Sequence, residues 1–329
     1  MRLEWRTNIV LFVMVLFSLA SSAVVAKAGS REFSDHLHVE KMPVGWEQQP
    51  IQYKKMPKDI DLAITLDQHL YPALTPLIER YAKSHALRIA VADGTCGISA
   101  GSLLDKRVDI GGFCCPAGEI DRLPGLTYHT LGIAAVALIV HTDNPVADVT
   151  LKQARDIYSG SIGSWSNIKP SFNQPIKTIA RLHCKNRPGH WRLILDNEDM
   201  FSPVTREIST IADMVEITSR QINALGYESL WMASLYGGKR GVKALMIDGV
   251  KPSDDAALIG HRYPFYRSYN ITTWSAKHLR SAHAEKLVDY IYQNFDQVDA
   301  KYGIVAADRL RDAGWQFSGD ELIGSPVGR

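Results

Sequence analysis

Four cysteines, Cys96, Cys114, Cys115 and Cys184, are the residues of this 329-residue sequence whose positions point most directly to chemistry. Each follows a short apolar segment that is predicted to be a β-strand. Because ligands of open parallel sheets bind beyond the carboxyl ends of the strands, we expect the four thiols to gather around one cleft. Thiolates favour soft ions such as Cu(I) and Zn(II), and three of them together suit trivalent arsenic. The alternative is one or two structural disulfides, which are the usual state of cysteines in an oxidising compartment.

Polar side chains at the same strand ends extend this candidate site. His69 and His183 are candidate imidazole ligands, although a histidine in such a loop is more often a surface or capping residue. Arg181 either holds an anion in a bidentate contact or forms a surface ion pair. The candidate ligand-binding residues are Thr95, Cys96, Cys114, Cys115, Arg181, Cys184, His69 and His183. The candidate metal ligands among them are Cys96, Cys114, Cys115 and Cys184.

Three neighbouring residues have competing interpretations. Asp67 either balances a bound cation or caps the following helix, and we favour the cap because aspartate is a common N-cap residue. Arg187 either binds an anion or forms an ion pair. His190 stands beside Trp191, which favours helix packing over contact with a ligand.

Apolar strands alternate with amphipathic helices along the chain, which predicts βαβ units, a parallel sheet and the α/β fold class. The predicted strands span 59–65, 87–92, 108–111, 133–140 and 176–182. The predicted helices span 71–85, 98–106, 151–159, 188–195 and 275–294. The run at 133–140, IAAVALIV, is the most apolar of the predicted strands.

The composition is that of a globular protein, with 46% hydrophobic and 22% charged residues, 24 glycines and 15 prolines. It excludes a disordered, collagen-like or coiled-coil chain. At roughly 150 residues per domain, the length indicates two lobes. The four cysteines include no C-x-x-C spacing, which argues against a thioredoxin-like site and against covalent haem attachment.

Residues 1–28 have the pattern of a secretory signal peptide, with a basic head, an apolar run over 9–25 and the cleavage triplet Ala26-Lys27-Ala28. We expect cleavage near Ala28 and export to the periplasm; an uncleaved membrane anchor is the rival interpretation. The remaining chain has balanced charges and no basic tract, so we expect no binding to nucleic acid. Residues 29–58 are polar and contain three prolines, which predicts an N-terminal arm on the surface.

Three stretches occur in a recognisable order. The first runs from GTCGI at 94–98 to KRVDIG at 106–111, the second is DIYSGSI with WSNI at 156–168, and the third runs from ALMIDGV at 244–250 to YPFYR at 263–267. Together they resemble the glycine-rich loop with its VDIG strand, the Trp-containing signature and the return strand of the phosphate-type periplasmic binding proteins of ABC transporters. The resemblance covers roughly residues 60–320.

This resemblance implies a type II periplasmic binding protein fold, in which two α/β lobes are joined by two crossover strands and close on a ligand in the cleft between them. The crossovers would be 131–140 and 263–271. Lobe 1 would comprise 59–135 plus 268–329 and lobe 2 residues 136–267, preceded by the signal peptide (1–28) and the arm (29–58). Arg267 would form a salt bridge at the hinge or contact the ligand.

The ligand loops depart from the family pattern. The segment LDQH at 66–69 replaces a Gly/Ser/Thr-rich loop, and Cys114 occupies the place of the family's acidic ligand. Arg181 is retained, but Cys184 stands in a loop that lacks the family's Ser-Gly-Thr. A disulfide between lobe 1 and Cys184 would cross the cleft and lock the hinge, so we expect at least one thiol to be free or only transiently paired.

These observations predict a monomeric, non-enzymatic solute-binding protein that captures a small oxyanion or a thiophilic metal or metalloid by hinge closure. No cofactor is expected beyond such a bound ion. The expected partners are the ligand and either an ABC transporter permease or a membrane sensor. The alternatives are a thiol redox enzyme and a metal-delivery protein, both built on Cys96, Cys114, Cys115 and Cys184.

Overall fold

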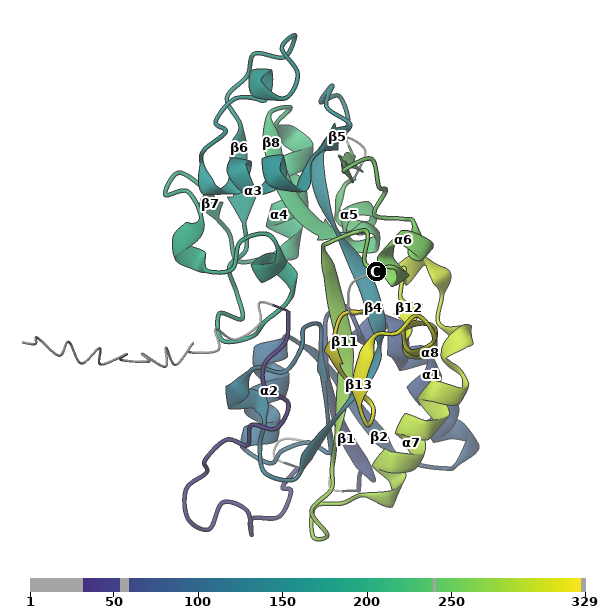
Figure 1. Cartoon of the computed structure of the whole chain (residues 1–329). Helices are drawn as coiled ribbons and strands as arrows, with labels where there is room; N and C mark the ends of the chain where they lie inside the picture. The colour runs from purple at the N-terminus through teal and green to yellow at the C-terminus, as the bar shows by residue number, and fades with distance from the viewer. Residues whose placement is uncertain (1–31, 54–58, 239–240, 327–329) are drawn as a thin grey trace, which may run out of the picture.

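A computed structural model describes residues 32–53, 59–238 and 241–326 (Figure 1). The predicted signal peptide at 1–28 lies outside these ranges, as do residues 29–31 and 54–58 of the predicted arm. Within the described ranges, no helix has the length and apolar character needed to cross a membrane.

Strands and helices alternate through most of the described chain. The strands are β1 Leu62–Asp67, β2 Ile89–Gly94, β3 Ile110–Phe113, β4 Leu126–His141, β5 Asp148–Val149, β6 Lys177–Ala180, β7 Arg206–Glu207, β8 Ala224–Ser229, β9 Val242–Ala244, β10 Met246–Ile247, β11 Tyr266–Trp274, β12 Val305–Ala306, β13 Gln316–Ser318 and β14 Glu321–Gly324. The α-helices are α1 Tyr71–Ser84, α2 Cys96–Leu104, α3 Leu151–Ser159, α4 Ile211–Arg220, α5 Leu230–Tyr236, α6 Asp255–Ile259, α7 Ala282–Gln293 and α8 Ala307–Asp312.

Ten strands form one mixed sheet in the order β2-β1-β3-β11-β4-β8-β6-β7, with β9 and β12 pairing with β4 off this path. β1 runs parallel to β2 and β3, and β6 runs parallel to β8. β4 and β11 are antiparallel to each other. The α/β class predicted from the sequence is confirmed, with antiparallel crossovers inserted between the parallel sections.

The long strand β4 is shared by both halves of the molecule. Its residues 126–135 pair with β11, and its residues 136–140 pair with β8. Residues 130–140 are all buried, as the apolar run IAAVALIV predicts for a strand covered on both faces. The crossovers expected at 131–140 and 263–271 correspond to β4 and β11.

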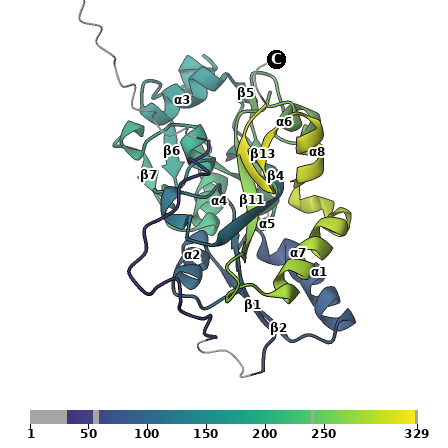
Figure 2. The same cartoon turned by 60° about the horizontal axis from the view of Figure 1, so that its bottom comes forward.

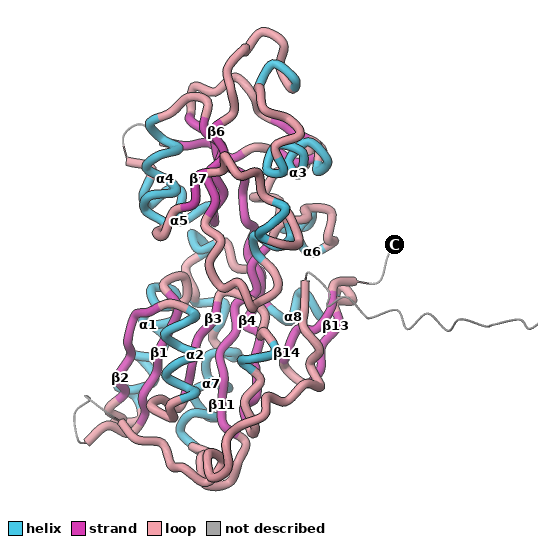
Figure 3. Tube along the Cα trace, turned by 90° about the vertical axis from the view of Figure 1, so that its left-hand side faces the viewer, coloured by secondary structure: helices cyan, strands magenta, loops and turns pink. Residues whose placement is uncertain are grey.

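Two hydrophobic cores lie in two lobes, which β4 and β11 connect through a narrow waist (Figures 1 and 3). The first lobe holds β1–β3, α1, α2 and α7, and its core includes Leu66 and Leu287. The second lobe holds β6–β8 and α3–α5, and its core includes Trp165 and Trp191. Leu310 of helix α8, near the end of the chain, packs into the second core. The exact residue limits predicted for the two lobes remain a prediction.

Two predicted helices differ from the observed ones for local reasons. The helix predicted over 98–106 begins at Cys96, because the Thr95 hydroxyl caps it by accepting the Ile98 N–H. The helix predicted from residue 188 is only a single 3-10 turn, His190–Leu193. Gly189 precedes that turn with a φ of +80°, a left-handed conformation that a helix cannot continue through.

The described part of the predicted arm, 32–53, is anchored rather than lying loosely on the surface. Phe33 is buried in the second core and Trp46 in the first. Lys106 donates hydrogen bonds from Nζ to three backbone carbonyls of the arm, and its Nζ lies 4.1 Å from the centre of the Trp46 ring. Figure 2 shows the arm running along one side of the molecule past α2.

The contact between β4 and β12 predicts a specific sensitivity. A Cβ atom at Gly132 would lie 2.1 Å from the backbone oxygen of Val305, so Gly132→Ala must displace β12. We expect it to lower the free energy of unfolding by about 1–3 kcal/mol, the usual effect of overpacking a core, measured by urea unfolding. Gly163→Ala is the matched control, because no atom lies within 4 Å of its added Cβ. Equal stability of the two variants would contradict this packing.

Candidate functional site

The four cysteine side chains, which the sequence places at separate strand ends, meet between the two lobes. The Cys96 sulfur lies 3.4 Å from that of Cys114 and 3.7 Å from that of Cys115. The sulfurs of Cys96, Cys115 and Cys184 all lie within 4.8 Å of one another. Cys184 belongs to the second lobe and the other three to the first. The structure therefore brings thiols of both lobes to one place, which we call the thiol cluster (Cys96, Cys114, Cys115 and Cys184).

Three different local structures position these thiols. Cys96 is the first residue of α2, Cys114 and Cys115 follow β3, and Cys184 lies in the loop after β6. The backbone N–H of Cys114 donates to the Cys96 sulfur at 3.2 Å, which ties the end of β3 to the start of α2. Cys184 has a φ of +55°, a left-handed conformation that non-glycine residues rarely adopt. Such strain persists only where the surroundings hold it, and it is common at binding sites.

The distances between the sulfurs show whether the cysteines are paired in disulfides or are free thiols. All four cysteines are free, and three of them are buried. The distances of 3.4 and 3.7 Å are far longer than a disulfide bond, which measures about 2.05 Å. They are close to the separation of about 3.8 Å between two thiolates that share a tetrahedral ion at about 2.3 Å. The four cysteines are therefore not paired in disulfides in this structure.

Hydrogen bonds within the cluster divide the thiols into two kinds. Bonds from Cys115 and Cys96 hold the pKa of the Cys184 thiol well below its usual range. Bonds from the same two residues lower the pKa of Cys114. Burial raises the pKa of the Cys96 and Cys115 thiols. The cluster thus favours the thiolate, which is the nucleophilic and metal-binding form of cysteine, at Cys184 and Cys114.

The two histidines of the second lobe lie beside Cys184. Ligating atoms of His183, Cys184 and His190 lie within 4.8 Å of one another, and the two rings stack with centroids 5.0 Å apart. His183 donates from Nδ1 to the Arg181 carbonyl, so its Nε2 carries the lone pair. His190 accepts the Trp191 N–H at its Nδ1, so its Nε2 carries the proton. Burial lowers the pKa of His190 to about 4, which keeps this ring neutral.

A buried network of charges lies against the cluster and joins the lobes. His69 bonds to Asp67 at 2.8 Å within the first lobe and to Glu228 of the second lobe at 3.1 Å. Arg267 of β11 pairs with Glu228 at 3.2 Å and places its Nη1 3.6 Å from the Cys114 sulfur. The hinge salt bridge expected for Arg267 is therefore present. The cap expected for Asp67 is wrong, because its carboxylate accepts hydrogen bonds from His69 and α1 has no side-chain cap.

These contacts fix the charges of the network. Burial opposes a charge on His69, but the Asp67 carboxylate raises the pKa of His69 well above its usual range. Burial likewise opposes a charge on Glu228, but Arg267 and His69 hold the pKa of that carboxyl well below its usual range. A buried ion pair of this kind is costly to break, since removing one partner leaves the other charge unpaired in the interior.

A second ion pair also joins the two lobes. Both guanidinium atoms Nε and Nη2 of Arg187, in the second lobe, contact the Asp121 carboxylate of the first lobe at 2.6 Å. Of the two interpretations offered for Arg187, the ion pair is therefore the one observed. The pair is buried between the lobes and does not lie on the surface. Gly118 allows the lobes to come this close, because a Cβ there would lie 2.2 Å from the Asn186 backbone oxygen.

The remaining predicted residues lie at the margin of the cluster. Thr95 is exposed, and its hydroxyl caps α2. Arg181 is buried; its Nε donates to the Ser209 carbonyl and its Nη1 contacts Nε2 of His183. Sequence reasoning missed Glu228 and Asp121, which hold the lobes together. Glu228 lies at the carboxyl end of β8, so the strand-end criterion used for the cysteines would have found it.

A pocket of about 720 Å³ opens between the lobes next to the charge network. Gln68, the neighbour of His69, lines it from the first lobe, and Trp231 and Leu235 of α5 line it from the second. Three of the four cluster thiols are buried, and none of the four cysteines lines this pocket.

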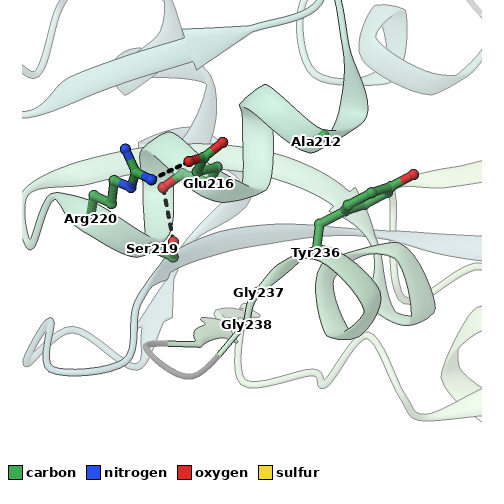
Figure 4. A pocket seen from close by; sticks show the side chains of 7 residues that line it. All are labelled: Ala212, Glu216, Ser219, Arg220, Tyr236, Gly237 and Gly238. Atoms are coloured by element: carbon green, nitrogen blue, oxygen red, sulfur yellow. Dashed lines mark hydrogen bonds and ion pairs between the residues drawn. The ribbon is translucent and has the colours of Figure 1, made fainter.

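Another pocket, of about 570 Å³, lies within the second lobe between α4 and the end of α5 (Figure 4). Arg220 is paired there with Glu216 on the same helix, and the Ser219 hydroxyl also bonds to the Glu216 carbonyl at 2.8 Å. The charged groups among its described lining residues are thus paired within α4, and none of these lining residues belongs to the thiol cluster.

The chain is similar to known solute-binding proteins over most of its length. A family model described as a PBP superfamily domain matches residues 55–294. Phosphate-binding protein PstS of Staphylococcus epidermidis is 25% identical over 169 residues, 47% of this chain and 51% of that protein. Phosphate-binding protein PstS 2 of Streptococcus agalactiae is 28% identical over 100 residues, 30% of this chain and 33% of that protein. The chain thus matches about half or less of the length of these relatives.

Solved structures show the same fold. A putative phosphate ABC transporter substrate-binding protein with bound phosphate from Clostridium perfringens superposes with a TM-score of 0.63 at 18% identity, over 75% of this chain and 99% of that one. An ABC-type phosphate transport receptor from Vibrio cholerae gives a TM-score of 0.59 at 19% identity, over 74% and 99%. At this level of identity the similarity establishes the two-lobed architecture and leaves the ligand open.

The burial of the cluster predicts how its thiols react. The unfolded, unreduced protein should carry four alkylatable thiols, counted by intact mass after denaturation. In the folded protein Cys184 should react first with iodoacetamide, because it is only half-buried while the other three are about 1% exposed or less. Peptide mapping of the alkylated protein identifies the site. A mass lower by two hydrogens, or first labelling at Cys96, would contradict this arrangement.

Proposed function

The chain belongs to the PBP superfamily, and we propose that it is an exported solute-binding protein that holds a thiophilic metal or metalloid at the thiol cluster between its lobes. The observation that carries the proposal is the origin of the ligands. Cys96 and Cys115 come from the first lobe and Cys184 from the second, yet their sulfurs lie within 4.8 Å of one another. An ion bound to all three is held only when the lobes are closed.

The paired state of the arginines weighs against an oxyanion as the ligand. Arg187 is bound to Asp121 and Arg267 to Glu228, while Arg181 is occupied by the Ser209 carbonyl and His183. An anion would have to break one of these buried contacts, and it would lie next to thiolates. Thiolates and imidazole instead select soft cations and thiophilic centres. The phosphate scaffold is therefore retained while the groups that face the ligand are replaced.

Closure and release follow from the interlobe contacts. The pairs His69–Glu228 and Asp121–Arg187 both cross the cleft and are buried in the closed form. Opening exposes these charges to water and separates Cys184 from Cys96 and Cys115. A hinge of this type delivers its ligand to a membrane partner, and we propose an ABC transporter permease or a membrane sensor in the periplasm as that partner.

A thiol redox enzyme is the second candidate, because Cys96 lies near both Cys114 and Cys115 and two thiols of the cluster have lowered pKa values. It predicts catalytic turnover of a disulfide substrate, whereas a binding protein takes up one equivalent of ligand and stops. Steady-state reduction of a small disulfide in the presence of a recycling reductant distinguishes the two. Sustained turnover that is lost in Cys96→Ser would favour the enzyme.

Ligand class is tested by titrating the reduced full chain with Ag(I), Zn(II), arsenite and phosphate, with tryptophan fluorescence and scattering to report closure. We expect a thiophilic species to bind at one equivalent and phosphate not to bind. Cys184→Ser should weaken that binding by about 100-fold or more, since even the residues around metal ligands contribute 10–100-fold. Met200→Ser is the control, because it removes an exposed sulfur of the second lobe. Tight phosphate binding that Cys184→Ser leaves intact would refute the proposal.

The buried ion pair between Asp121 and Arg187, which holds the two lobes together, gives a separate prediction. Asp121→Asn leaves Arg187 buried without its anion, a change that costs about 3–5 kcal/mol when it occurs in a folded interior. Because the pair exists only in the closed form, we expect the variant to be more open in solution scattering and to bind the ligand at least about tenfold more weakly. Glu198→Gln is the control, since Glu198 contacts Lys185 and Arg192 within one lobe. If Asp121→Asn changes neither the solution scattering nor the ligand affinity, this ion pair does not hold the lobes closed.

A further inference from the structure

The coordination number offered by the thiol cluster is three. The sulfurs of Cys96, Cys115 and Cys184 form a group in which all lie within 4.8 Å of one another, and Cys114 is not part of this group. The Cys114 sulfur lies 3.4 Å from that of Cys96 and 3.6 Å from Arg267 Nη1. The two histidines beside Cys184, which are the candidate nitrogen ligands for completing a tetrahedron, are already committed. The site thus resembles a three-sulfur cup more than a four-ligand cage.

The two histidines illustrate this commitment. A histidine that binds a metal through one nitrogen normally donates a hydrogen bond from the other. His190 instead accepts the Trp191 N–H at Nδ1 at 2.7 Å, so its Nε2 keeps a proton and has no lone pair for an ion. This Nε2 is fully buried and has no hydrogen-bond partner in the described structure. The free nitrogen of His183 is in contact with Arg181 Nη1 at 3.2 Å.

The charge that the cup tolerates is the second constraint. The arginines nearest to it, Arg187 and Arg267, are each neutralised by a carboxylate. The Asp67 carboxylate lies 3.6 Å from the Cys96 sulfur. Three thiolates around a monovalent ion leave two negative charges, and around a divalent ion they leave one. Around a trivalent centre they leave none, and a neutral complex is by far the least costly to bury.

We propose that the ligand is a trivalent group-15 metalloid, arsenic(III) or antimony(III), bound by Cys96, Cys115 and Cys184. This inference rests on the proposed function and names its substrate class. Such a centre forms three bonds in a pyramid and carries a lone pair in the fourth direction. It therefore needs three ligands on one side and no fourth ligand, which is what the cup supplies.

The binding step is an exchange without oxidation or reduction. Arsenous acid, As(OH)₃, is uncharged at neutral pH and enters without an anion site. The Cys96 and Cys115 thiols each give their proton to one As–OH group, and the third As–OH group takes a proton from solvent as the Cys184 thiolate replaces it; three As–S bonds form, three As–O bonds break, and three water molecules leave. Sulfur and arsenic keep their oxidation states. Lobe closure, which brings Cys184 to the other two thiols, completes the third bond.

The inference is tested on the full chain, reduced with a phosphine so that no competing thiol is present, with arsenite as the probe. We expect a native mass increase of one arsenic atom less three hydrogens, protection of three thiols from alkylation, and an X-ray absorption spectrum with three sulfur neighbours and no oxygen. Cys184→Ser should bind arsenite at least about 100-fold more weakly, and Met200→Ser should bind like the original chain.

The outcomes separate this inference from the proposal it rests on. If Ag(I) or Zn(II) binds through Cys184 and arsenite does not displace it, the metalloid assignment is overturned while the thiophilic binding protein stands. If none of these binds and phosphate does, both fail. If Cys184→Ser does not fold, the count of protected thiols in the unaltered chain decides, and protection of fewer than three overturns the inference.

Discussion

The structure depends on a buried set of charges that joins two lobes which have separate hydrophobic cores. Glu228 of the second lobe binds both His69 of the first lobe and Arg267 of the shared strand β11. Because these groups are almost completely buried, each requires the others, and the lobes meet in one orientation. Asp121 and Arg187 add a second buried ion pair between the lobes. The positions of the sulfurs follow from these pairs, since Cys184 reaches Cys96 and Cys115 only when the lobes are held together.

The comparison with phosphate-binding proteins separates what this chain shares with them, the architecture, from the groups that lie between its lobes. The architecture matches theirs over three quarters of the chain, including a structure with bound phosphate. A fold nevertheless hosts many ligands, and the groups at the site decide which one is bound. Here the cleft holds thiols, and its arginines are engaged with carboxylates or backbone. The molecule keeps the two-lobed architecture of these proteins and places four thiols between its lobes.

Much of the fold was readable from the sequence because it depends on local pattern. The apolar run at 133–140 indicated the buried centre of β4, and the spacing of apolar residues placed α1 and α3 within a residue or two. Predictions failed where a single local group decided the outcome. The Thr95 cap moves the start of α2 to Cys96, and Gly189 limits the following segment to one 3-10 turn. Asp67 looked like a helix cap, but the nearby imidazole of His69 captures its carboxylate.

The sequence by itself determined that four cysteines follow strand ends and that the chain has the motifs of a two-lobed binding protein. Periodicity and spacing record the strand ends, and the two-lobed fold is what the resemblance of the motifs to a known family implies. Only the tertiary structure decided that the thiols are free and share one site, that Glu228 and Asp121 hold the lobes together, and that the arginines are already paired. Those facts depend on distances between residues that are far apart in the chain, such as the 159 positions between His69 and Glu228. No local pattern encodes such distances, because they arise only when both lobes have folded and closed.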